Sequence, residues 1–168
     1  MGRVHRYAVT VRWTGNLGSG TSNYRSYGRQ YDISGEGSKP VILGSSERIF
    51  RGDPARWNPE ELLVASISAC HKLWYLHLCA ISGVTVTDYL DNAEGFMEEN
   101  EDGSGHFQKV TLRPEVKLAP GADVSLAEKL HEDAHAKCFI ASSVNFPVEH
   151  EPRIMVSKET VLREIRSS

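Results

Sequence analysis

Residues 58–83, NPEELLVASISACHKLWYLHLCAISG, decide the fold, because they contain a helix start, an apolar interior and a helix stop. Asn58 is a favoured N-cap residue, Pro59 suits the first helical position, and the acidic Glu60 suits the positive end of the helix dipole. Gly83 stands where a left-handed residue commonly ends a helix. The sequence therefore predicts one helix of about 24 residues, ~36 Å long.

The interior of this helix is apolar on nearly every side, which is typical of a helix inside a core or a membrane. His71, Lys72 and His77 interrupt the apolar run near its middle, where charge is costly in a bilayer. We therefore predict a buried core helix and no membrane as a partner.

Alternation of apolar and polar residues predicts strands on both sides of the helix. In the first strand Val9, Val11 and Trp13 share one face, which is typical of a half-buried strand. In chain order the predicted elements are strands 4–13, 24–34 and 41–43, the long helix, a β-hairpin of strands 84–97 and 106–118, a second helix from Ser125 to about Cys138, a strand at 153–157 and a short helix at 158–166. This order predicts a single α+β domain over residues 1–168.

The composition is that of an ordinary folded domain. The 168 residues include 40% hydrophobic and 24% charged side chains, which excludes a disordered chain. The net charge is −3 with both signs mixed along the chain, so a nucleic-acid partner is not expected. The first residues lack the apolar segment of a secretory signal, and we expect a cytoplasmic protein.

The three cysteines differ in their helical positions. Cys70 and Cys79 are nine residues apart on the predicted helix, so they point to opposite faces and cannot form a disulfide with each other. Cys138 is the only intramolecular partner left for either of them. Because Cys70 lies in mid-helix, away from the positive end of the dipole, a thiolate there needs a cation from elsewhere in the fold.

Three interpretations of the cysteines are open at this point. They can be small apolar core residues, as free cysteines commonly are. His131, His135 and Cys138 share one face of the second predicted helix, so they can also be metal ligands. A thiol hydrolase would need a histidine and an Asn or Asp brought to Cys70 by the fold, and no local motif supports one.

Two segments carry a family resemblance: NPEELLVASISAC at residues 58–70 and AHAKCFIASSV at residues 134–144. In these motifs and their spacing the chain resembles the OsmC/Ohr family of organic hydroperoxide reductases. The resemblance implies a thiol-dependent peroxidase, with Cys70 as the peroxidatic residue and Cys138 as the resolving residue. Two departures concern the residues that follow each cysteine: His71 follows the first, and Phe139 replaces a proline after the second.

The resemblance also implies that Glu60 holds an arginine over the Cys70 thiolate. Arginine suits this role because it stays protonated and can bridge a carboxylate and a substrate oxygen. The candidates are Arg25, Arg29, Arg48 and Arg51. We favour Arg25, which lies on an aromatic strand face, and Arg51, which lies shortly before the helix.

Glu60 and Cys70 are ten residues apart, which is ~15 Å along one straight helix and too far for one shared arginine. Glu60 of one subunit is therefore expected to complete the site around Cys70 of the other. This agrees with the family, whose resemblance implies antiparallel sheets wrapped around a long central helix in an intertwined homodimer. It also implies no metal or flavin cofactor.

The resemblance implies a dithiol reductant of the lipoyl type and an organic hydroperoxide as substrate. The apolar residues Ile67, Leu73 and Trp74 around Cys70 suit such a substrate better than hydrogen peroxide. The alternative function is a non-catalytic module on the same fold that binds small hydrophobic molecules.

Overall fold

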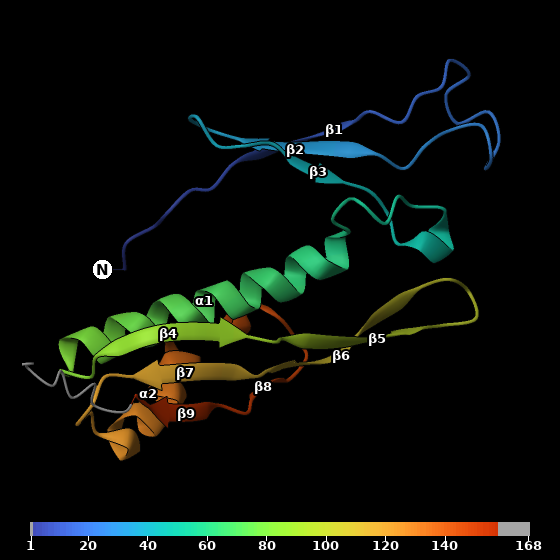
Figure 1. The fold of residues 1–168 in the computed structure, drawn as a ribbon. Helices are drawn as coiled ribbons and strands as arrows, with labels where there is room; N and C mark the ends of the chain where they lie inside the picture. Colours follow the sequence, from blue (N-terminus) through green and yellow to red (C-terminus); the bar gives the residue numbers. More distant parts are fainter. Residues whose placement is uncertain (1, 158–168) are drawn as a thin grey trace, which may run out of the picture. The chain divides into compact units, whose positions relative to one another are not determined.

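The computed structural model describes residues 2–157 (Figure 1). They belong to two compact units, of which the first ends at Leu63 and the second begins at Val64. The predicted helix at residues 158–166 lies outside the described residues. The single-domain organisation stays a prediction.

The first unit contains a three-stranded antiparallel sheet in the order β1 (Val9–Trp13), β2 (Tyr31–Gly35) and β3 (Ile42–Gly44). A short 3₁₀ helix, η1 (Arg48–Phe50), follows it. The strands at their predicted places are confirmed, but two of them are shorter than predicted. Residues 4–8 precede β1 without strand structure.

Residues 24–30 form turns and loop instead of the first part of the predicted strand 24–34. The Arg29 guanidinium donates hydrogen bonds to the carbonyl oxygens of Tyr24 and Tyr27, at 2.9 and 2.6 Å. It also lies over both tyrosine rings, 4.4 and 4.1 Å from their centroids. These local contacts bend the chain, which is why the alternating pattern does not continue as a strand.

The prediction that the first strand is half-buried is wrong for the described chain. Val9, Val11 and Trp13 are 70%, 61% and 43% exposed. The sheet of the first unit is a single layer, so the alternating face has the composition of a buried face without being covered.

Helix α1 (Pro59–Ile81) confirms the predicted long helix and both of its ends. The Asn58 side chain accepts a hydrogen bond from the Glu61 backbone N–H at 2.7 Å, and the Glu61 carboxylate accepts one from the Asn58 N–H at 3.2 Å. This reciprocal pair is a capping box. At the other end Gly83 adopts φ = 75°, a conformation that favours glycine after a helix.

Only one face of α1 is buried, so the prediction of a buried core helix is correct for that face alone. The buried residues are Ile67, His71, Tyr75, Leu78 and Cys79. On another face Leu73 is 64% exposed. By length and composition alone α1 could cross a membrane, a property that core helices of soluble proteins share.

The second unit contains two further sheets. Their orders are β4 (Val86–Asp91), β7 (Pro114–Leu118), β9 (Arg153–Val156) and β5 (Glu94–Glu99), β6 (Gly105–Leu112), β8 (Val148–His150). The predicted hairpin is confirmed, but each of its long strands is divided in two, so that it contributes to both sheets. Both sheets are mixed, because β8 and β9 follow a helix and pair in parallel with β6 and β7.

Helix α2 (Val124–Lys137) confirms the second predicted helix, with a correction at its start. The helix begins at Val124, one residue before the predicted Ser125, and its N-cap is Asp123, whose carboxylate accepts a hydrogen bond from the Leu126 N–H at 3.0 Å. The 3₁₀ helix η2 (Ala141–Ser143) follows it.

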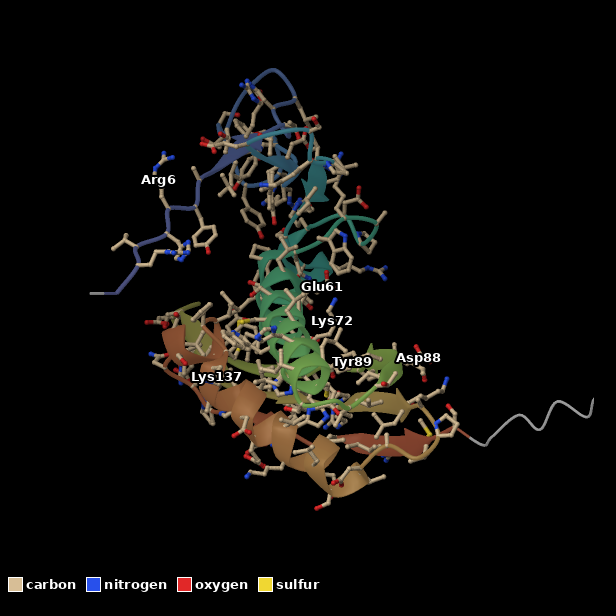
Figure 2. The ribbon with its side chains drawn as sticks, turned by 90° about the vertical axis from the view of Figure 1, so that its left-hand side faces the viewer. Arg6, Glu61, Lys72, Asp88, Tyr89 and Lys137 are labelled. Atoms are coloured by element: carbon tan, nitrogen blue, oxygen red, sulfur yellow. The ribbon has the colours of Figure 1, made fainter. Side chains whose placement is uncertain are left out.

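The core of the second unit lies where α1, α2 and β7 meet. Its buried members are Tyr75, Leu78, Cys79, Val84, Val116, Leu118, Ala127, Leu130 and Ala134. Tyr89 of β4, labelled in Figure 2, packs beside Tyr75 with ring centroids 6.0 Å apart. This packing fixes α1 and α2 against the same sheet and so sets the positions of the side chains between them.

Candidate functional site

The structure brings Cys70 of α1 together with Cys138 at the C-terminal end of α2. The structure places their thiols beside each other, and no disulfide is present among the three cysteines. Cys70 is partly exposed, whereas Cys138 is 1% exposed. Cys79 lies on the opposite face of α1 in the core, as its spacing from Cys70 predicts.

The electrostatic surroundings separate the cysteines by reactivity. Burial, and then the neighbouring Cys70 thiol, raises the pKa of Cys138 to about 11. Burial also raises the pKa of Cys79. Both are therefore protonated thiols near neutral pH, and since the thiolate is the nucleophile, neither is suited to a first attack on a substrate. Cys70 is the remaining cysteine and the accessible one.

The chain after α2 orients the Cys138 sulfur. Cys138 is the C-cap residue of the helix, and the Ala141 N–H donates a hydrogen bond to its Sγ at 3.4 Å. The backbone N–H and the hydroxyl of Ser142 both donate to the Cys138 carbonyl oxygen, at 3.0 and 2.9 Å. The turn that begins at Phe139 therefore holds the second thiol in a fixed direction.

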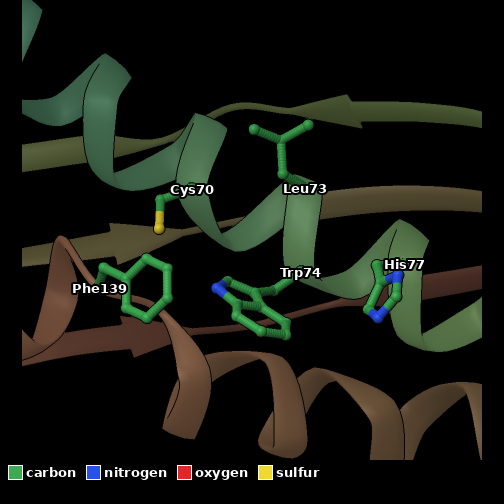
Figure 3. A pocket seen from close by; sticks show the side chains of 5 residues that line it. All are labelled: Cys70, Leu73, Trp74, His77 and Phe139. Carbon is green, nitrogen blue, oxygen red and sulfur yellow. The ribbon is translucent and has the colours of Figure 1, made fainter. Parts of the chain in front are cut away.

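An apolar pocket of about 410 Å³ opens beside the first thiol (Figure 3). Its lining residues are Cys70, Leu73, Trp74, His77 and Phe139. The four from α1 follow the i, i+3, i+4, i+7 spacing of one helix face. The pocket thus presents a thiol at one end of an apolar wall and an imidazole at the other. Ile67, expected in the same wall, is a core residue with no exposure.

Aromatic contacts shape this pocket. The Trp74 ring meets Phe139 edge-on, with centroids 5.6 Å apart, and meets His77 in the same manner at 5.9 Å. The Lys137 ammonium lies 5.8 Å from the centre of the Trp74 ring. Trp74 is therefore held from both helices, and the pocket has a cation at its rim.

A cluster of buried histidines lies next to the thiols. His71 and His131 are 1% and 0% exposed, and the His71 Nε2 and His131 Nδ1 atoms are 3.0 Å apart. Burial, and then the neighbouring His150 and His135, lowers the pKa of His71 to about 4. Burial, and then His71 and His150, lowers the pKa of His131 to about 3. Both imidazoles are neutral near pH 7.

The metal interpretation of His131, His135 and Cys138 is not supported. His131 pairs with His71, and Cys138 pairs with Cys70, so these side chains turn to different partners. Within residues 2–157 the structure shows no group of three His, Cys, Asp or Glu side chains arranged to hold a metal ion.

The remaining site residues predicted from the family lie in the first unit. Glu60 is in the first turn of α1, where its charge adds to burial in raising the pKa of Tyr31. Arg51 has φ = 66° and its guanidinium lies 5.9 Å from the Tyr24 ring centre. In the part of the chain that the structure describes, neither Arg25 nor Arg51 forms an ion pair with Glu60. Their roles stay predictions.

Sequence reasoning missed His77 and Phe139 as pocket residues and the pairing of His71 with His131. The sequence held part of the information about the pocket residues. His77 is seven residues from Cys70 on the same helix face, and Phe139 follows Cys138 directly. Nothing in the sequence shows that His71 and His131 meet, because they lie on different helices.

The fold and the site together define a dithiol protein of the α+β class, with one accessible thiol beside an apolar pocket and a second thiol buried behind it. The chain belongs to the OsmC-like protein family, whose model matches residues 52–153. The family prediction and the predicted OsmC-like fold are thereby confirmed.

Individual relatives agree with this assignment. An OsmC-like protein of unknown function from Vibrio cholerae is 30% identical in sequence, with a TM-score of 0.81 over 89% of this chain and 100% of its own. An organic hydroperoxide resistance protein from Elizabethkingia anophelis shares the fold at 16% identity, with a TM-score of 0.67 over 94% of this chain and 100% of its own. The uncharacterized protein YmaD of Bacillus subtilis is 30% identical over 95 residues, which are 55% of this chain and 63% of that relative's length.

Proposed function

We propose that this protein is a thiol-dependent peroxidase that reduces organic hydroperoxides to alcohols. The observation that carries the proposal is the position of Cys70, which faces an apolar pocket and whose thiol lies beside the buried thiol of Cys138. A nucleophilic thiol needs access to substrate, and a resolving thiol needs contact with the first but protection from substrate. The fold shared with organic hydroperoxide resistance proteins supports the same assignment.

The proposed reaction has two steps. The Cys70 thiolate attacks the distal oxygen of the hydroperoxide, the O–O bond breaks, and the alkoxide takes a proton to leave as an alcohol. Cys70 becomes a sulfenic acid. The Cys138 sulfur then attacks the Cys70 sulfur, the S–O bond breaks, and hydroxide leaves with the Cys138 proton as water. A dithiol of the lipoyl type would return the disulfide to two thiols.

A homodimer is part of the proposal. The uncovered apolar residues of β1 and the exposed Leu73 of α1 are side chains that a second subunit could bury. In that dimer Glu60 of one subunit and an arginine, Arg25 or Arg51, would act on Cys70 of the other. We also propose a cytoplasmic location, where a thiol pair is kept reduced between turnovers.

The second candidate function is a module that binds small hydrophobic molecules without reacting with them. The apolar lining of the Cys70 pocket favours it, because Leu73, Trp74 and Phe139 offer binding surface that needs no chemistry.

Thiol counting separates the two functions. Reduced protein, freed of reductant, receives one equivalent of cumene hydroperoxide. The peroxidase should form one equivalent of alcohol and lose two of its three thiols per chain. The Cys70→Ser variant should lose none and form no alcohol, while Cys79→Ser should behave as the wild type. Hydroperoxide recovered unchanged from wild-type protein with all thiols intact would leave only the binding function.

A further inference from the structure

A buried imidazole pair joins the two helices that carry the thiols. His71 of α1 and His131 of α2 approach to 3.0 Å between Nε2 and Nδ1, and their rings are parallel within 7° with centroids 5.4 Å apart. Neither side chain is accessible to solvent beyond 1%. The contact is therefore a single hydrogen bond across the α1–α2 interface, made in the absence of competing water.

His131 is clamped between two residues of α1. The Tyr75 ring stacks on it with centroids 3.7 Å apart and planes within 12°, while His71 binds it through the hydrogen bond. His71 and Tyr75 are four residues apart and so lie one above the other on the same face of α1. This clamp fixes both the position and the ring orientation of His131.

The clamp is linked to both thiols through the two helices that carry them. His71 follows Cys70 directly on α1. Cys138 comes seven residues after His131, which places the two on the same face of α2, ~10 Å apart along the axis. A shift of α2 along α1 that breaks the imidazole hydrogen bond would therefore also move Cys138 relative to Cys70.

The hydrogen bond requires that at least one of the two imidazoles be neutral, because one nitrogen must donate and the other must accept. Burial lowers the pKa of both rings well below neutrality, so both are neutral at pH 7 and the acceptor is present. The groups around the pair are Tyr75 on α1, His135 and Glu132 on α2 and His150 on β8, with His150 Nε2 3.3 Å from the Glu132 carboxylate.

We propose that His71 and His131 are positioning residues that hold Cys138 against Cys70 and thereby set the rate at which a Cys70 sulfenic acid is converted into the disulfide. The proposal rests on the peroxidase function. It concerns the second step only, because the pair contacts neither the pocket nor the substrate.

The second step competes with damage. A Cys70 sulfenic acid that meets a further hydroperoxide is oxidised to the sulfinic acid while the hydroperoxide is reduced to an alcohol, and this loss is irreversible without a dedicated repair enzyme. The ratio of disulfide to sulfinic acid therefore reports how well Cys138 is positioned.

Amide substitutions test the hydrogen bond itself. A glutamine amide occupies the place of a histidine Nε2 and an asparagine amide that of Nδ1, and either amide group can donate or accept. His71→Gln and His131→Asn should keep the bond, whereas His71→Asn and His131→Gln should lose it. The same two changes at His106, which is exposed on β6, serve as the control.

The protein variants are mixed with a small excess of cumene hydroperoxide at pH 7, and the disulfide and sulfinic products are quantified by mass spectrometry. We expect the share of sulfinic acid to rise about tenfold in His71→Asn and His131→Gln, because small misplacements slow reactions between held groups strongly. His71→Gln and His131→Asn should match the wild type, and the rate of first oxidation of Cys70, followed by the initial consumption of hydroperoxide, should be the same in all.

Equal product ratios in all four variants and the wild type would overturn the proposal. So would equal damage in all four, because that would show a requirement for the ring's volume and not for its hydrogen bond. A first step that slows as much as the second would overturn it too. If one variant does not fold, the asparagine and glutamine variants at the other histidine position test the proposal. Failure of the peroxidase function would be seen separately, as a wild-type protein that consumes no hydroperoxide.

Discussion

An equal mixture of a Glu60→Ala chain and a Cys70→Ser chain, refolded together as dimers, is expected to recover about a quarter of wild-type peroxidase activity, although each variant alone is inactive. Helix α1 runs without a break from Pro59 to Ile81, so the ten residues between Glu60 and Cys70 span ~15 Å along its axis. A bidentate arginine contact cannot bridge that distance. The two side chains can serve one site only if they come from different subunits.

The two chains are unfolded and refolded together in equal amounts. Random pairing makes about half of the dimers mixed, and each mixed dimer holds one site with both native residues and one with neither, which gives the quarter. Native mass spectrometry establishes how many mixed dimers form. A mixture as inactive as its parents, despite mixed dimers in the expected amount, would contradict the shared site.

Acid should destabilise the protein through the buried histidines. The pKa values of His71 and His131 are lowered to about 4 and about 3, against about 6.5 in an unfolded chain. A lowered histidine pKa stabilises the fold fully above the unfolded value, and this contribution is lost as the pH falls below 6.5 towards the folded values. Between pH 7 and 5 the free energy of unfolding should fall by about 3 to 4 kcal/mol.

Urea unfolding at fixed protein concentration measures this change. The interval from pH 7 to pH 5 lies above the usual pKa values of carboxylates. The histidines therefore dominate the change in the free energy of unfolding over this interval. The matched control is the double variant His71→Gln/His131→Asn, which keeps a neutral hydrogen-bonded pair that cannot titrate. Its free energy of unfolding should change far less over the same range. An equal fall in both proteins would place the acid sensitivity elsewhere.

The fold was largely predictable where local chemistry decides the structure. The two ends of α1 are determined by Asn58 and Gly83, whose conformational preferences act within a few residues of themselves. The face of α2 that carries Leu130, Ala134 and Cys138 was predictable for the same reason, because helical spacing alone puts these residues together.

Contacts that an alternating pattern does not reveal limited the predictions of the strands. Residues 24–30 alternate as a strand does, but the guanidinium of Arg29 finds the carbonyl oxygens of Tyr24 and Tyr27, and this local contact outcompetes strand pairing. The exposed first strand shows a second limit, which concerns burial and not strand formation. Val9 and Val11 have the pattern of a buried face, yet a pattern cannot say which surface, or which molecule, covers that face.

The candidate site likewise has a part that the sequence predicts and a part that it does not. The opposite directions of Cys70 and Cys79 followed from their spacing on one helix, and the contact of Cys70 with Cys138 agrees with the family resemblance. The imidazole pair behind the thiols could not be predicted, because it depends on how α2 packs against α1. His71 and His131 are 60 residues apart in the chain.

The central claim is that Cys70 and Cys138 form a redox pair in which Cys79 has no part, and disulfide mapping tests it most directly. Reduced protein receives one equivalent of organic hydroperoxide, free thiols are blocked at low pH, and the digest is analysed by mass spectrometry without reduction. The account predicts a peptide pair linked through Cys70 and Cys138, with Cys79 recovered in its blocked form. A disulfide that includes Cys79, or no disulfide at all after the hydroperoxide has been consumed, would contradict it.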